Sequence, residues 1–167
     1  MARELTHRPT DGPSGEEIVR ARPRNLAGQG QVIPVRLPPA RILRAGAPPD
    51  DQLLVVRGGR NSLSDANLER ATGDCWEEYE FFGFSVFGAP DDDLVGLCAV
   101  ISQIRRRPEV RVVRCGELRA LGFEVAATFS NPLHFSVVLP DVTPATFARL
   151  RSGFSEAVAN PGYEPDR

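Results

Sequence analysis

The sequence predicts an α+β domain with a mixed, mostly antiparallel sheet and about three helices, preceded by an extended arm rich in proline and arginine. Short apolar segments that alternate with a period of two are interspersed with segments whose apolar residues recur every three to four positions. Two of the strand-like segments, 123–129 and 134–139, follow one another across a short Ser-Asn-Pro turn. The chain of 167 residues is long enough to bury a hydrophobic core.

Proline, glycine and arginine dominate residues 1–50, which show little periodicity. We therefore expect a flexible arm over 1–50, of which 31–50 is strapped onto an α+β domain spanning 51–160. Residues 161–167 are expected to form a disordered tail. The arm is interpreted either as a linker or as a segment that binds a protein partner.

The elements are expected in the order strand, helix, strand, helix, strand, short helix, strand, strand, helix. We expect strands over 53–57, 81–87, 110–115, 123–129 and 134–139, helices over 64–72, 91–107 and 143–158, and one or two helical turns over 116–122.

The first helix is expected to begin at Ser64, a good N-cap, and to stop at Gly73. Residues 74–80 then form an acidic loop that carries Trp76 and Tyr79. Their rings are interpreted either as a stacking surface for a flat ligand or as a lid on the core.

The strand over 81–87 places Phe82, Phe84 and Val86 on one face, so Ser85 lies on the other. Acidic residues 91–93 suit the start of the second helix, and Arg105–Arg107 suit its end before Pro108. One stripe of this helix is apolar and consists of Leu94, Leu97, Cys98, Ile101 and Ile104.

The last helix begins at Thr143, an N-cap, with Pro144 at its first position. Phe147, Leu150, Phe154 and Val158 form its apolar face.

Several classes of protein are disfavoured by composition. The formal net charge of −2 gives no overall attraction to nucleic acid, although every basic residue except histidine is an arginine. No segment approaches the ~20 apolar residues that span a bilayer, and the N-terminus lacks the apolar region of a secretory signal, so we expect a cytoplasmic location. Cys75, Cys98 and Cys115 are widely spaced, which argues against a structural zinc site and predicts no bound metal.

Arg57 ends the first strand, directly before Gly58 and Gly59. Glycine allows a ligand to approach the backbone, and a guanidinium group binds phosphate through two hydrogen bonds. Arg57 is therefore a candidate for anion binding. The alternative is a structural arginine that pairs with Asp50, Asp51 or Glu77.

Residues 53–140 resemble the ADP-ribosyltransferase fold. The similar features are the Arg57-Gly58 pair at the end of a strand, the Gly-Phe-Ser-Val-Phe strand at 83–87 before an acidic-capped helix, and the later segments 116–123 and 134–140. The resemblance implies that Arg57 binds the phosphates of NAD, beside Gly58. It also implies that Ser85 supports the nicotinamide side and that Tyr79 or Trp76 stacks on the ring.

The catalytic glutamate motif of that family is not found in the late strands. Glu77, Glu78 or Glu80 would replace it if residues 74–80 fold over the site. The resemblance implies an enzyme that consumes NAD and transfers ADP-ribose to a macromolecule, as bacterial toxins and modifying enzymes do.

Two other functions remain open. A non-catalytic accessory protein would bind its partner through residues 1–50. Alternatively, Arg105, Arg106, Arg107 and Arg111 would form a patch that binds the phosphates of RNA or DNA.

His134-x-Ser136 resembles one motif of the two-histidine phosphoesterases. The second histidine of the chain, His7, lies in the arm and not in such a motif. We expect instead a hydrogen-bonded His134 at the start of a strand.

Overall fold

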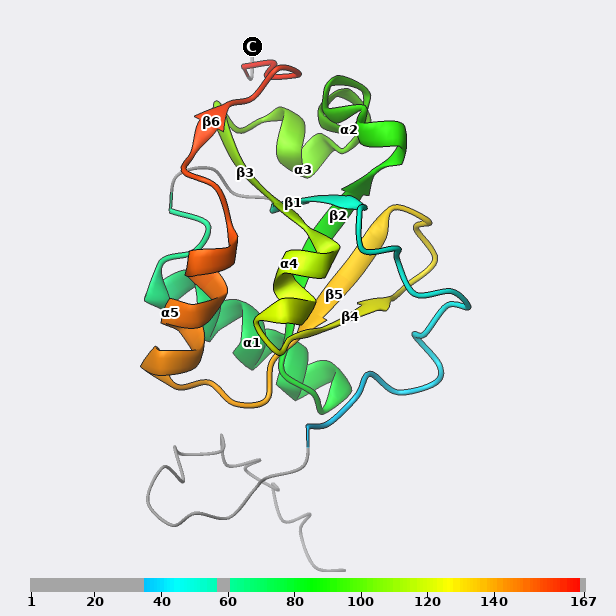
Figure 1. Ribbon diagram of the computed structural model, residues 1–167, viewed down its shortest axis with the longest axis vertical. Helices are drawn as coiled ribbons and strands as arrows, with labels where there is room; N and C mark the ends of the chain where they lie inside the picture. Colours follow the sequence, from blue (N-terminus) through cyan, green and yellow to red (C-terminus); the bar gives the residue numbers. More distant parts are fainter. Residues whose placement is uncertain (1–34, 57–60, 166–167) are drawn as a thin grey trace, which may run out of the picture.

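Six strands form one sheet in the order β4-β5-β2-β1-β3-β6 in the computed structural model, which describes residues 35–56 and 61–165 (Figure 1). The strands are β1 (Leu53–Val56), β2 (Gly83–Ala89), β3 (Glu109–Arg114), β4 (Glu124–Ala127), β5 (His134–Val138) and β6 (Val158–Ala159). The helices are α1 (Asp65–Tyr79), α2 (Leu94–Val100), α3 (Ser102–Arg105), α4 (Cys115–Ala120) and α5 (Pro144–Gly153), with a 3-10 turn at Pro90–Asp92.

The predicted α+β class is confirmed. The strand pairs that the structure describes are all antiparallel, and there are five α-helices in this part of the chain, where about three were expected. The number of helices exceeds the expected number for two reasons. The second expected helix is divided into α2 and α3, and residues 115–120 form a complete short helix.

Two hydrophobic cores lie on opposite faces of the sheet. Leu54, Val56, Phe84 and Val86 of the central strands β1 and β2 face a core that α1, α4 and α5 cover. Val55, Phe87 and Ala89 face a second core with α2 and α3. The predicted alternation along β2 is therefore confirmed at Phe84 and Val86, and Ser85 lies on the face opposite to theirs.

Helix α1 continues through Gly73, so the expected stop there is wrong, and residues 74–79 are helical. Ser64 is the N-cap as predicted, and its side chain accepts a hydrogen bond from the Asn67 N–H. The helix ends at Glu80, which adopts a left-handed conformation with φ 62°. Burial of Leu68 and Thr72 against the core offsets the ~1 kcal/mol that one interior glycine costs.

The predicted helix over 91–107 is interrupted at Ile101, whose backbone is extended. Its predicted apolar stripe nevertheless forms the second core, where Leu97, Cys98, Ile101 and Ile104 are buried. Helix α3 consequently begins on a new axis at Ser102. Helix α5 likewise ends at Gly153, earlier than expected, because Val158 leaves the helix and pairs with Val110 of β3.

The end of the described chain packs against α3 and β3. The Asn160 side-chain amide donates to the carbonyls of Ile104 and Arg107, and the Glu164 N–H donates to the Arg105 carbonyl. The C-terminal segment thus fixes the end of α3, where the arginines lie.

Residues 42–44 lie beside the end of the edge strand β4, whereas Pro48 and Asp50 contact α4 through Arg119 and the Gly116 N–H (Figure 1). The Arg44 N–H donates to the Ala127 carbonyl at 2.9 Å, and the Phe129 N–H donates to the Ile42 carbonyl at 2.7 Å. We call residues 36–44 the strap. The remainder of the predicted arm, residues 1–34, lies outside the described residues.

Gly73→Ala should stabilise the protein by about 0.5–1 kcal/mol, because a Cβ at this helical position would meet nothing within 4 Å. Gly122→Ala is the matched control. A Cβ there also meets nothing within 4 Å, but the backbone has φ +83°. That variant should be destabilised by about 1 kcal/mol or more. Denaturant unfolding of both variants tests whether Gly73 lies inside α1. A loss of stability in Gly73→Ala would contradict that position.

Candidate functional site

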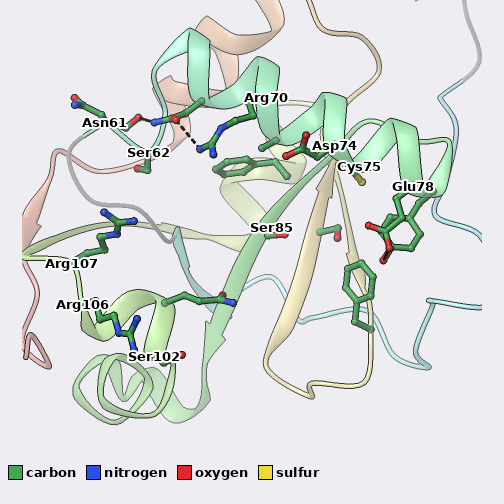
Figure 2. A pocket seen from close by; sticks show the side chains of 18 residues that line it. Asn61, Ser62, Arg70, Asp74, Cys75, Glu78, Ser85, Ser102, Arg106 and Arg107 are labelled. Carbon is green, nitrogen blue, oxygen red and sulfur yellow. Dashed lines mark hydrogen bonds between the residues drawn. The ribbon is translucent and has the colours of Figure 1, made fainter. Parts of the chain in front are cut away.

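A groove of about 820 Å³ lies between α1 and α3, with β2 and β5 beneath it (Figure 2). This volume is in the range usual for small-molecule sites. Figure 2 shows Arg70, Asp74, Cys75 and Glu78 along α1 on one side, Ser85 on the floor, and Ser102, Arg106 and Arg107 on the opposite side. Asn61, Ser62, Asn67, Ala71, Tyr79, Gly83, Phe84, Gln103, Phe129 and Ser136 complete the lining.

Helical spacing explains the wall formed by α1. Arg70, Asp74 and Glu78 are four residues apart, so they lie on one face of the helix. The Arg70 guanidinium donates to the Asn67 side-chain oxygen at 3.1 Å. This wall therefore presents one cation and two carboxylates to the groove.

Strand register explains the floor. Ser85 of β2 lies directly opposite Ser136 of β5, and both belong to the sheet face that carries Phe87. Two hydroxyl groups thus lie side by side where the second hydrophobic core ends.

Two predicted site residues, Tyr79 and Ser85, line this groove together. Tyr79 is there because α1 continues past Gly73 to the end of the groove. Its hydroxyl donates to the Glu78 carboxylate at 2.5 Å, and this hydrogen bond raises the pKa of Tyr79. The Tyr79 ring also contacts Phe129 edge-on at 5.2 Å between centroids.

The other aromatic candidate lies elsewhere. Trp76 stacks on Phe82 at 4.6 Å between ring centroids, and the Arg36 guanidinium of the strap lies 5.1 Å from its ring centre. Trp76 does not line the groove. Its partly buried ring serves instead to attach the strap to α1.

Among the acidic candidates, Glu78 lines the groove. Glu77 and Glu80 are exposed and outside the lining, and Glu80 is the left-handed C-cap of α1. Arg57 and Gly58 lie outside the described residues. Asn61, the first described residue after them, lines the groove.

The four arginines of the predicted patch have different surroundings. Arg106 and Arg107 line the groove. Arg105 pairs with Glu164 at 3.5 Å, while the Arg111 guanidinium donates to the Ser155 carbonyl at 2.9 Å and lies 3.9 Å from Glu156. Two of the four are thus engaged by the C-terminal segment rather than directed to the groove.

A hydrogen-bonded row of three side chains is the part of the site that the sequence indicates least. Thr128 Oγ1 lies 3.0 Å from His134 Nδ1 and 2.8 Å from Ser136 Oγ. Because the Thr128 hydroxyl has one proton, it donates to one neighbour and accepts from the other. The protonation of His134 Nδ1 therefore decides whether Ser136 directs a proton or a lone pair toward the groove.

The expected hydrogen-bonded histidine at a strand start is confirmed, since His134 is the first residue of β5. The alternation of His134 and Ser136 in the sequence indicates their common face, whereas the position of Thr128 follows from the β4–β5 register. Next to it, Phe129 adopts φ 59°, a conformation that costs a bulky residue on the order of 1 kcal/mol.

Ser62 is 5% exposed, and its hydroxyl has no hydrogen-bond partner among the described residues. It lines the groove beside Asn61. A buried hydroxyl without a partner costs free energy, so a polar ligand that reaches it gains a hydrogen bond at no expense to the protein.

Cys75 lies in the groove, where burial raises the pKa of its thiol to about 12. The unfolded thiol ionises near pH 8.5, so the unfolded state loses its proton first as the pH rises. We expect the free energy of unfolding to fall above about pH 8.5, and to fall less steeply in Cys75→Ala. Urea unfolding at pH 7.5 and pH 10 measures both slopes, and equal slopes would contradict a raised pKa at the partly buried Cys75.

Comparisons with protein-family models, with curated proteins and with solved structures found no match. Within residues 35–56 and 61–165, no group of three histidine, cysteine or acidic side chains is placed to hold a metal ion. No helix in the same ranges is long and apolar enough to cross a membrane.

Proposed function

We propose that the groove between α1 and α3 binds a dinucleotide of the NAD type. The observation that carries the proposal is the convergence of Tyr79 and Ser85. The resemblance to ADP-ribosyltransferases assigns both residues to the nicotinamide side, and they reach one groove from different elements. The two residues are six positions apart across the turn that joins α1 to β2, and the end of α1 and the start of β2 together present them to the groove.

The phosphates would lie toward α3. Arg106 and Arg107 present guanidinium groups to the groove, and such groups form charge-assisted hydrogen bonds with phosphate oxygens. Arg57 has this role by resemblance. Ser62, Ser102 and Ser136 add hydroxyl groups suited to ribose and amide groups.

The reaction would be transfer of ADP-ribose. The bond between the ribose C1′ and the nicotinamide nitrogen breaks, and nicotinamide leaves with the bonding electrons. An acceptor nucleophile then bonds to C1′ and loses its proton. Of the three acids predicted to replace the family's glutamate, Glu78 lines the groove, and its negative charge would stabilise the oxocarbenium-like transition state.

A nucleic-acid patch receives less support, because Arg105 and Arg111 are engaged by Glu164 and Ser155. Partner binding through residues 1–50 stays a prediction. The described part of that segment contacts β4 through residues 42–44, α1 through Arg41, and α4 through Pro48 and Asp50.

Calorimetric titration with NAD tests binding. The single variants Arg106→Gln and Arg107→Gln should each bind about 10- to 100-fold more weakly, since one charge-assisted bond is worth about 1.5–3 kcal/mol. Arg57→Ala should weaken binding similarly. Arg149→Gln is the matched control. This exposed arginine belongs to α5, lies over the Phe123 ring and does not line the groove. Absence of wild-type binding at millimolar NAD would refute the proposal.

Release of nicotinamide tests the transfer step. Glu78→Gln should lower its rate about 100-fold or more while NAD binding is retained, because the amide keeps the shape and loses the charge. Glu69→Gln, an exposed position earlier on α1, is the control. Parallel Glu77→Gln and Glu80→Gln variants test the other acids. A full rate in Glu78→Gln would assign the chemistry to another residue.

A further inference from the structure

A second, smaller pocket of about 350 Å³ adjoins the groove. The two share Ser85, Ser102, Gln103 and Phe129, so a single ligand can extend from one into the other. We call it the base pocket. Beyond the shared residues, its lining consists of Phe87, Val100, Ile101, Ser130, Asn131 and His134.

Aromatic rings form one side of the base pocket. The His134 ring lies edge-on to Phe129 at 4.9 Å and edge-on to Phe87 at 5.2 Å between centroids. Such a cluster provides flat, polarisable surface against which a planar heterocycle packs favourably.

Amide and hydroxyl groups contribute the polar part of the pocket lining. Asn131 accepts the Leu133 N–H on its side-chain oxygen at 2.9 Å, which leaves its amide nitrogen as a donor. Gln103 contributes an exposed amide, with one donor group and one acceptor. Among the described residues, no arginine, aspartate or glutamate lines this pocket, in contrast to the neighbouring groove.

The Phe129 wall is held in place from outside the pocket. The Phe129 N–H donates to the Ile42 carbonyl of the strap, and Arg44 Nη2 donates to the His134 carbonyl at 2.7 Å. These bonds maintain the left-handed backbone at Phe129, with φ 59°. Strained backbone that its surroundings enforce is characteristic of ligand sites.

We propose that the base pocket binds an uncharged nucleobase. Rings that stack, amides that donate and accept, and a described lining without arginine or carboxylate side chains suit a flat heterocycle better than an anion or a cation. The adjoining wall with Arg106 and Arg107 lies where the phosphates of the same nucleotide would extend. This inference deepens the proposed function and rests on it for the phosphate side.

Nucleosides without phosphate test the base pocket by itself. Adenosine, guanosine, cytidine and uridine are titrated into the full chain, with binding followed by NMR. At least one should bind, about tenfold or more weakly in Phe129→Ala. Gln103→Leu, at an exposed position of α3, should also weaken binding and change the preference among bases. Arg149→Gln, at an exposed position of α5 that lines neither pocket, is the control and should leave nucleoside binding unchanged.

Absence of nucleoside binding at millimolar concentration would overturn the inference, as would binding that both variants leave unaffected. Nucleoside binding without NAD binding would retain the base pocket and refute the dinucleotide proposal. NAD binding insensitive to Phe129→Ala and Gln103→Leu would refute only the base pocket.

The source of the base is decided by comparing NAD with a short single-stranded oligonucleotide. Tighter binding of NAD that is lost in Gln103→Leu identifies the base as part of the small ligand. Tighter binding of the oligonucleotide identifies a base of a nucleic-acid strand, and both results support the base pocket.

Discussion

The register of β2 between β1 and β5 is the constraint on which the rest of the structure depends. Because side chains alternate along a strand, this register directs Phe84 and Val86 into one core and Phe87 into the other. The same alternation places Ser85 next to Ser136 at the margin of the second core. A slip of β2 by one residue would turn Phe84 and Val86 out of the first core and Ser85 into it, so both cores oppose it.

The polar floor of the groove is therefore a by-product of hydrophobic packing. Helices α2 and α3 cover Val55, Phe87 and Ala89, and the groove begins where this cover ends. The break at Ile101 contributes to the shape of the site. It lets Ile101 remain buried while the chain changes direction, and α3 then carries Arg106 and Arg107 to the wall facing α1. Packing of the apolar residues determines where these charges lie.

Local patterns predict most of the elements, because alternation and caps are properties of neighbouring residues. Ser64, Thr143 and Pro144 mark the starts of α1 and α5 correctly. Gly73 misleads, since a glycine within a helix and a glycine after it are alike in a sequence and differ only in tertiary packing. This error in the expected end of α1 also affects the candidate site, because Tyr79, which lines the groove, lies on a helix and not in a loop. The row of Thr128, His134 and Ser136 requires the β4–β5 pairing, and the role of Phe129 requires a bond to Ile42, which no local pattern contains.

The strap has a consequence for solubility. An uncovered edge strand offers unpaired N–H and C=O groups to any other extended chain, and this is a common start of aggregation. Residues 36–44 occupy part of the β4 edge through the Leu43–Thr128 bridge and the Arg44 N–H to Ala127 bond. At the opposite edge β6 has only two residues, which limits the length available for pairing. The segment that positions the pocket wall thus also keeps the sheet from extending into a neighbouring molecule.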